Sequence, residues 1–381
     1  MRIAAGERNT PDGRGPWSTD LLPDIPQTSH RSPSGTFRAE PSDEEDTLSV
    51  PYPSVVEHRR SGRDLLDRVV IAAALALVAG TLVGFLGGSW WVFDLLANLR
   101  TQLALVLVVV TVGLLLVRRW GVAALAVAAT AINVALVLPI LSGSQEPAAA
   151  ADAQVLDATF FNTKIRADKD ATIAHLEARD DDVIVLAGAD MSWVTAMQVS
   201  DLDLHVVSGG HLDQGLEILV MVRDPDAEVT VHRLTDEDRD ALVEVVVQLD
   251  GGPVHVVGTH PVSPKTRSRA ERRDLLLDWI GEWGAARDAP VVVMGDLNAT
   301  PWSVPFRAML DRSGLVDSQR VHGIQPSWPA GSGPLGLPID HVLHSPELTT
   351  LERGLGPSFG SDHRMVHARI TRHDPTASQE E

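Results

Sequence analysis

Acidic, amide and imidazole side chains in this chain stand repeatedly at the ends of apolar runs that are typical of buried strands. The most distinctive run is VVVMGDLNATPWS at 291–303, which delivers Asp296 and Asn298 to its end. These two residues are two positions apart, so on an extended backbone their side chains point the same way. A carboxylate and an amide that converge on one point suit a nucleophilic water held beside a phosphate. The structural alternative is an Asp and an Asn that cap a strand-to-helix turn.

Another acidic and imidazole pair precedes the last apolar run of the chain, in GSDHRMV at 360–366. Asp362 and His363 are neighbours, which would point apart on a strand, but from a loop both can reach one cavity. A carboxylate suits a divalent cation, whereas an imidazole suits a phosphate oxygen or general acid–base work. Taken alone, the motif is also compatible with a purely structural loop.

Asp340 lies inside the apolar run LPIDHVLHS at 337–345. Its neighbours Ile339 and Val342 indicate a buried position, and a buried charge needs a partner. An imidazole is a suitable partner, because the carboxylate would fix its tautomer and stabilise its protonated form. His341 faces the other way by strand alternation, so we expect it to be structural.

Two further polar residues stand at strand ends. His260 closes the β-branched run in VVGTHPVSP at 256–264, and Asn162 closes the run in TFFNTKI at 159–165. Each of them alone is compatible with a structural residue. The chain therefore carries, in order, Asn, His, GDxN, Asp and SDH at successive strand ends, and this recurrence favours one shared site.

The elements that must position these residues begin at 155, where apolar strands and helices start to alternate. Several strands follow one another directly, which favours antiparallel hairpins in an α/β domain over a purely parallel, doubly wound sheet. We expect strands at 155–161, 183–187, 203–207, 215–222, 228–234, 242–249, 253–259, 290–294, 339–343 and 365–371. We expect helices at 168–179, 191–199, 268–285 and 303–312.

The first third of the chain has a different character. Residues 1–64 are rich in Pro, Ser, Gly, Arg and Asp without hydrophobic periodicity, which predicts a disordered tail. Residues 65–141 hold three long uncharged segments, which predict three transmembrane helices. These segments are 69–88, 101–117 and 121–141. We expect a linker at 142–154, a catalytic-type domain at 155–372 and a short disordered tail at 373–381.

The placement of Lys and Arg predicts the orientation in the membrane. The stretch before the first span carries Arg59, Arg60, Arg63 and Arg68. The turn between the second and third spans carries Arg118 and Arg119, whereas the loop between the first and second holds only Arg100, together with Asp94. We therefore expect a multi-pass protein of the cell membrane with a cytoplasmic N-terminus. Because the number of spans is odd, the C-terminal domain would lie outside the cytoplasm.

Charge and composition narrow the partners. Residues 1–141 hold 12 Lys and Arg against 13 Asp and Glu, and residues 142–381 hold 20 against 38, giving −1 and −18. Such an acidic domain argues against tight, non-specific binding of nucleic acid, because affinity for the phosphate backbone comes from Lys and Arg. The absence of Cys excludes disulfides, Cys–zinc sites and thiol catalysis.

One basic cluster could guide a phosphate. It begins the helix expected at 268–285, but acidic residues are interleaved with it, so a solvated helix face is the alternative. Its members are Arg267, Arg269, Arg272 and Arg273, with Glu271 and Asp274 between and after them.

The ordered strand-end residues resemble the endonuclease/exonuclease/phosphatase (DNase I-like) superfamily, over about 155–371. The resemblance is carried by GDLNATPWS, by PSWP followed by IDHVL, and by GSDH. Within the superfamily the chain looks most like the bacterial membrane-anchored branch, where apolar helices precede the domain and GTHP carries the first histidine. The resemblance implies a four-layer αββα sandwich with two packed, mostly antiparallel sheets. It also implies hydrolysis of phosphoester bonds with Mg²⁺ or Mn²⁺.

By matched position, the resemblance also implies roles for single residues. Asn162 would orient metal or phosphate, and Asp362 would bind the metal. His260 would contact the phosphate. Asp296 would position or deprotonate the attacking water, with Asn298 beside it. Asp340 would pair with His363.

One departure from the family pattern bears on activity. Family members usually carry a Gln-Glu pair at the end of the second strand, and its Glu is a principal metal ligand, but Ala187 and Gly188 stand there in this chain. Asp190 or Glu217 could replace the missing ligand. The main expectation is a nuclease, or a phosphodiesterase or phosphatase of lipids or small molecules. The alternative is an impaired member that binds phosphorylated ligands or a partner without turnover.

Overall fold

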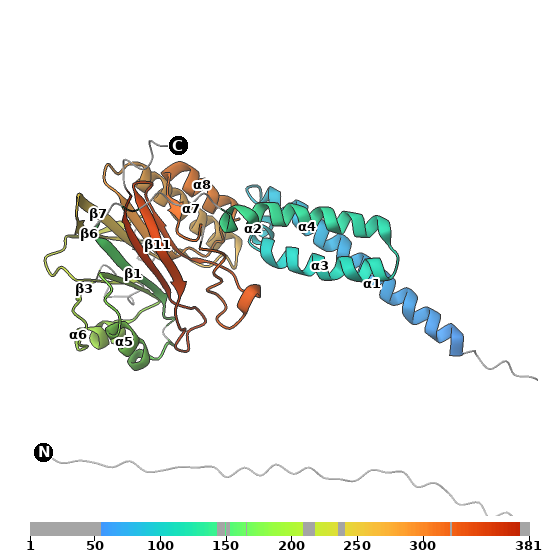
Figure 1. The fold of residues 1–381 in the computed structure, drawn as a ribbon, viewed down its shortest axis with the longest axis horizontal. Coiled ribbons are helices and arrows are strands. Elements are labelled where there is room, and N and C mark those ends of the chain that lie inside the picture. The colour runs from blue at the N-terminus through green and yellow to red at the C-terminus, as the bar shows by residue number, and fades with distance from the viewer. Residues whose placement is uncertain are drawn as a thin grey trace, which may run out of the picture. The chain divides into compact units, whose positions relative to one another are not determined.

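The computed structural model describes residues 55–142, 149, 153–164, 166–208, 218–234, 241–320 and 322–373, with side chains from residue 64 onward. Most of the expected tails, most of the expected linker and Glu217 lie outside these residues. Figure 1 shows the course of the chain.

Two mixed six-stranded sheets form the C-terminal part of the chain. The first sheet has the strand order β11-β12-β1-β2-β4-β3. Its strands are β1 (Val155–Asn162), β2 (Val183–Ala187), β3 (His205–Ser208), β4 (Ile218–Val222), β11 (Leu348–Leu355) and β12 (Val366–Arg372). The second sheet has the order β5-β6-β7-β8-β10-β9. Its strands are β5 (Val229–Arg233), β6 (Ala241–Leu249), β7 (Gly252–Thr259), β8 (Val291–Asp296), β9 (Val316–Asp317) and β10 (Asp340–His344).

Each sheet contains one parallel pair among otherwise antiparallel neighbours, as the direct succession of strands predicted. The parallel pairs are β1–β2 and β7–β8, and each needs a crossover element. Helix α5 (Lys169–Glu177) makes the first crossover and α7 (Arg267–Ala285) makes the second. The β6–β7 hairpin turns instead at Gly251 and Gly252, whose φ angles of 89° and 118° favour glycine.

The two sheets pack face to face and carry helices on their outer faces. The central core joins side chains such as Phe160 and Val185 of the first sheet to Val256 and Val292 of the second. Helices α5 and α6 (Met191–Gln198) cover the first sheet, and α7 and α8 (Val304–Ser313) cover the second (Figure 1). The structure therefore has the expected αββα layers. Strands β9 and β11 were not predicted from the sequence.

Apolar helices precede this sandwich. They are α1 (Val55–Val83), α2 (Trp91–Ala97), α3 (Arg100–Leu116) and α4 (Trp120–Leu141), with a short 3₁₀ turn at Gly84–Leu86. Helix α1 begins inside the segment expected to be a disordered tail. Two helical stretches, Asp64–Leu86 and Trp120–Leu141, are long and apolar enough to cross a membrane. The pair α2 and α3, bent by 64°, could form a third span, so two or three spans are possible.

Helix α2 docks onto the sandwich through buried polar contacts that the sequence did not reveal. The Asp94 carboxylate lies 2.9 Å from the guanidinium of Arg273 on α7, and both side chains are buried. Asp94 also accepts hydrogen bonds from the Ser303 hydroxyl and from the backbone N–H of Val304, at the start of α8. The Asn98 side chain accepts another from the Thr300 N–H. The expected solvated face is therefore wrong for Arg273, and Asp94 is not a free loop residue.

The half-buried His367 of β12 makes folding of the sandwich pH-dependent. Burial and the nearby Arg179 lower the pKa of His367 to about 4, below its ordinary value of 6.5. Its neutral ring therefore contributes stability above pH 6.5, and this contribution is lost as the pH falls from 6.5 towards 4. We expect a loss on the order of 2–3 kcal/mol in the free energy of unfolding. Unfolding of the full chain at several pH values measures it. The variant His367→Gln should lose less stability over this range, and equal slopes would contradict the assignment.

Candidate active site

The strand registers bring five of the predicted polar positions together at one end of the sandwich. In the parallel pair β7–β8, Thr259 lies opposite Gly295, so His260 and Asp296 follow at adjacent strand ends. A Cβ at position 295 would collide with the Thr259 carbonyl oxygen, which explains the glycine before Asp296. Asp340 lies directly opposite Asp296 in the antiparallel pair β8–β10. Asn162 at the end of β1 and His363 in the loop before β12 complete the group.

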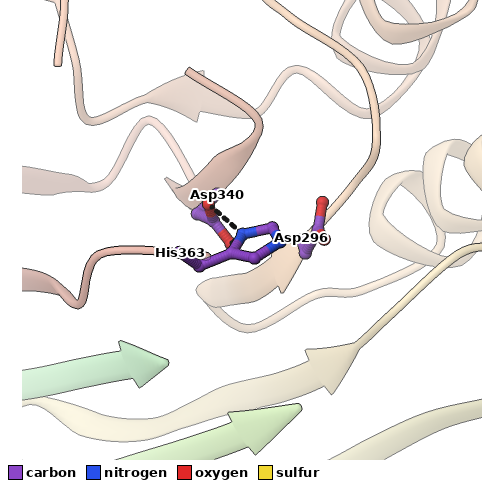
Figure 2. A group of neighbouring side chains, drawn as sticks. All are labelled: Asp296, Asp340 and His363. Atoms are coloured by element: carbon purple, nitrogen blue, oxygen red, sulfur yellow. Dashed lines mark hydrogen bonds and ion pairs between the residues drawn. The ribbon is translucent and has the colours of Figure 1, made fainter. Parts of the chain in front are cut away.

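His363 lies between two carboxylates (Figure 2). Its Nδ1 is 2.9 Å from Asp340 Oδ2, and its Nε2 is 3.6 Å from Asp296 Oδ2. Burial alone would lower the pKa of His363, but Asp340 and Asp296 outweigh this and raise the pKa to about 9. The ring is therefore an imidazolium at neutral pH, able to donate from Nε2 towards a bound anion.

Asp296 is buried and stays ionised. Burial alone would raise its pKa, but the charges and hydrogen bonds of His363 and His260 hold the pKa well below its usual range. The Asn162 side-chain N–H donates to Asp296 Oδ2 at 2.9 Å, and His260 Nε2 lies 3.5 Å from the same oxygen. A carboxylate so fixed can accept a hydrogen bond from a water molecule, as general-base chemistry requires.

The position of Asn298 beside Asp296 is set by a turn and not, as predicted, by strand alternation. It lies beyond the end of β8 in the left-handed region, with φ of 50°, so strand alternation does not orient it. Its backbone N–H donates to Asp296 Oδ1 at 3.0 Å, and its side-chain N–H donates to the Pro261 carbonyl oxygen at 2.9 Å. Asn298 therefore shapes the turn that presents Asp296.

These residues line a cavity of about 540 Å³, a size typical of ligand sites. Polar residues of the site contribute to it, namely Asn162, His260, Asp296, Asn298 and His363. Further lining residues are cations (Lys164, Lys265, Arg269) and side chains of an apolar wall that includes Leu95, Leu99, Val262, Leu337 and Ile339. Sequence reasoning missed the wall and both lysines.

Residues 159–363 match the Endonuclease/Exonuclease/phosphatase family, which is more than half of the 381 residues. The chain belongs to this family. As a member of the endonuclease/exonuclease/phosphatase family it is a hydrolase that acts on phosphoester bonds. No curated protein matches the chain.

Solved structures of family members are similar to the chain at low identity. An endonuclease/exonuclease/phosphatase from Beutenbergia cavernae is 20% identical, with a TM-score of 0.44, over 58% of this chain and 72% of that one. TDP2 of D. rerio, complexed with a single-strand DNA product, is 17% identical, with a TM-score of 0.46, over 57% and 99%. The 3′ phosphatase NExo from Neisseria, bound to a product DNA hairpin, is 20% identical, with a TM-score of 0.44, over 56% and 98%.

The position of the absent family glutamate is closed to a side chain. Gly188 follows β2 with φ of 64°, and a Cβ there would lie 3.1 Å from Asn162 Oδ1 and from the Lys164 N–H nitrogen. Asp190 caps helix α6, where its carboxylate accepts hydrogen bonds from the Ser192 and Trp193 N–H groups. It is not among the residues that line the cavity. The Asp190 carboxylate is therefore used as the N-cap of a helix and not as a ligand at the cavity.

Asp362, next to His363 in the chain, has one carboxylate oxygen that accepts hydrogen bonds and one that is buried. Its Oδ2 accepts hydrogen bonds from Lys164 Nζ and from Trp328 Nε1, each at 3.1 Å. Its Oδ1 is buried without a hydrogen-bond partner among the described residues, 3.9 Å from His363 Nε2. Burial alone would raise the pKa of Asp362, but Lys164, Trp328 and His363 lower it overall. An ionised, under-coordinated carboxylate oxygen suits a hard cation.

The residues present fit a divalent cation, but with few anionic ligands. Asp362 Oδ1 offers a carboxylate oxygen, and Asn162 Oδ1 offers an amide oxygen that also accepts a hydrogen bond from the Lys164 N–H at 3.1 Å. Ligand atoms of Asp296, Asp340 and His363 also lie within 4.8 Å of one another, yet Asp340 and His363 are already bonded to each other. Mg²⁺ commonly uses one or two carboxylates together with substrate phosphates and water. The donor set therefore suits an ion that binds weakly until substrate arrives.

Restoring the family glutamate as Gly188→Glu should not restore a tighter metal site. We expect the positive φ and the contacts with Asn162 and Lys164 to lower the free energy of unfolding by about 2 kcal/mol. The affinity for Mn²⁺ should not rise. Gly314→Glu is the matched control, because Gly314 has φ of 72° with nothing within 4 Å of an added Cβ, so it isolates the backbone strain. Tighter Mn²⁺ binding by Gly188→Glu at unchanged stability would contradict this interpretation.

Proposed function

We propose that this chain is a membrane-anchored, metal-assisted phosphoesterase whose catalytic domain lies outside the cytoplasm. One observation carries the proposal. His363, held by Asp340, faces Asp296 at a cavity where Asn162 and His260 also converge. A cationic donor beside an ionised acceptor is the arrangement that hydrolysis of a phosphoester by water requires.

The residues divide the work as follows. The Asp296 carboxylate accepts a hydrogen bond from the attacking water and orients it towards phosphorus, while the adjacent turn at Asn298 holds this carboxylate in place. His363 and His260 donate hydrogen bonds to phosphoryl oxygens and stabilise the charge that develops there. Asp340 keeps His363 protonated and oriented. Asp362 and Asn162 would hold Mg²⁺ or Mn²⁺, which when bound adds positive charge beside the phosphoryl oxygens.

Three spans with the expected orientation are part of this proposal. Asp67, near the start of the apolar stretch Asp64–Leu86 of α1, pairs with Arg119 in the α3–α4 turn at 3.0 Å, so both groups lie at one end of the candidate spans. The domain contacts the opposite end, where Trp302 Nε1 donates to the Leu136 carbonyl oxygen of α4. The arginine-rich end would be cytoplasmic, which places the domain on the outside. A reporter that works only in the cytoplasm can be fused to the C-terminus to test this orientation. Activity of that reporter would overturn the orientation.

A second candidate function rests on the closed position of Gly188. A member without the glutamate that binds phosphorylated ligands, or a protein partner, without turnover would keep the fold and the phosphate contacts. Lys164 favours this candidate, because its ammonium already neutralises Asp362 Oδ2 at 3.1 Å.

Turnover separates the two functions. The full chain, purified in detergent, is assayed with bis-p-nitrophenyl phosphate, a plasmid and a phospholipid, each with Mg²⁺, with Mn²⁺ and with EDTA. We expect hydrolysis of at least one substrate that depends on added metal. Absence of turnover on all three, together with no measurable binding of Mn²⁺, would favour the non-catalytic function.

A further inference from the structure

We propose that the substrate is a phosphoester that carries an alkyl chain, as a membrane lipid does, and that this chain lies against the wall formed by Leu95, Leu99, Val262, Leu337 and Ile339. The inference rests on the proposed function and names its substrate class. These five side chains, called the apolar wall below, line the same cavity as the reacting groups.

The cavity is lined by both polar and apolar side chains, as a site for an amphiphile would be. His260, Asp296 and His363 offer hydrogen bonds and charge for a phosphoryl group. The apolar wall offers only hydrocarbon, and its members Leu95 and Leu99 are half-buried, so part of each side chain remains open to the cavity. A small hydrophilic phosphoester would leave this surface in contact with water, whereas an alkyl chain would cover it.

The part of the apolar wall that α2 contributes is held in place because this helix is anchored to the sandwich. Leu95 belongs to α2, and the residues before and after it on that helix hold the sandwich. Asp94 forms the buried ion pair with Arg273, and Asn98 accepts the hydrogen bond from Thr300. A wall held by buried polar contacts is preorganised for a ligand.

The apolar wall also lies where a membrane lipid could reach it. Helix α2 follows the candidate span Asp64–Leu86 and is the first part of the bent pair α2–α3, so in a three-span arrangement it would lie at the end of a span, next to the membrane surface. Exposed apolar side chains flank it in the chain or lie on the loop that contacts α3 through the Gln102 side chain. They are Phe85, Leu86, Trp90 and Leu335, which are 47–58% exposed. Such side chains favour the bilayer interface.

Charge argues against a nucleic acid as the occupant. The net charge of residues 142–381 is −18, the balance of 20 Lys and Arg against 38 Asp and Glu. Among the described residues that line the cavity, the cations are Lys164, Lys265, Arg269 and the His363 imidazolium, enough for one phosphate group and its surroundings. A nucleic acid needs a row of such contacts along its backbone.

Binding of methyl-, butyl- and hexylphosphonate tests the inference without turnover, because the C–P bond of these ligands is not hydrolysed. The full chain in nanodiscs is titrated calorimetrically, with empty nanodiscs as the blank. Each fully buried methylene strengthens binding about fourfold. Because the apolar wall covers one side of the chain, we expect affinity to rise roughly 30-fold from methyl- to hexylphosphonate.

The variant Leu95→Gln should reduce this rise to less than about tenfold, since it replaces hydrocarbon of the wall with an amide. Leu96→Gln is the matched control, because Leu96 lies on the same helix but does not line the cavity. It should keep the full rise. No rise with chain length, an equal rise in Leu95→Gln, or displacement of hexylphosphonate by a short oligonucleotide would each overturn the inference. Hydrolysis of bis-p-nitrophenyl phosphate reports on the proposed function separately.

Discussion

Replacing Asp296 with asparagine is expected to lower kcat/KM for bis-p-nitrophenyl phosphate by about 10³- to 10⁴-fold. The amide keeps the shape of the side chain but loses the negative charge that orients water and that faces His363 at 3.6 Å. The two charged oxygens of Asp296, which accept hydrogen bonds from the Asn162 side chain and from the Asn298 backbone N–H, are also lost. Steady-state kinetics of the purified full chain measure the effect.

Asp317→Asn provides the matched control for Asp296→Asn. Asp317 is likewise a buried carboxylate of the second sheet that contacts a histidine, with its Oδ2 3.2 Å from His341 Nδ1. It does not line the cavity. We expect this variant to be less stable but to keep kcat/KM within about threefold, because it changes no group near the phosphate. Equal losses in the two variants would show that both act through folding.

The largest effect on stability is expected for Asp94→Ala. It removes one of the two carboxylates that pair with the buried Arg273 guanidinium, leaving only Asp274, whose side chain is partly exposed. It also removes the acceptor of the Ser303 hydroxyl and the Val304 N–H. Breaking a buried pair from one side typically costs about 3–5 kcal/mol. Unfolding of the full chain in detergent should show a loss of this size. The double variant Asp94→Leu with Arg273→Met should recover part of it, because it removes both buried charges, although Asp274 and the Asn298 carbonyl oxygen also lose their contacts with Arg273.

Asp67→Ala is the matched control for Asp94→Ala. It breaks an ion pair of similar length, 3.0 Å to Arg119, but the Arg119 side chain is 50% exposed. A surface pair contributes less than about 1 kcal/mol. A loss for Asp67→Ala as large as that for Asp94→Ala would contradict the view that burial sets the energy.

The sequence predicted best where local pattern and topology agree. The β-branched run at 290–294 predicted a strand that ends before Asp296, and β8 (Val291–Asp296) lies there. The close approach of Gly295 to Thr259 was seen only in the structure. Asp340 was expected to pair with His363, and the two are bonded in the structure. Strand β11, in contrast, carries Glu352 and Arg353 in its middle, and its pairing with β12 depends on the rest of the sheet.

Contacts between segments far apart in the sequence could not be predicted from the sequence. Thr300 and Ser303 looked like ordinary turn residues after the GDxN motif, yet they receive α2. Nothing local to Asp94 distinguishes a loop acid from the buried partner of Arg273. Lys164 lies in a left-handed turn beside Gly188, and only the fold brings its ammonium to Asp362.

The central claim is that water attacks phosphorus at the site of Asp296 and His363. Hydrolysis of bis-p-nitrophenyl phosphate by the full chain in ¹⁸O-enriched water tests it directly. We expect one ¹⁸O atom from solvent in the released p-nitrophenyl phosphate, none in the p-nitrophenol, and almost no product from Asp296→Asn. Label in the phenol, or equal labelled product from Asp296→Asn, would contradict the claim.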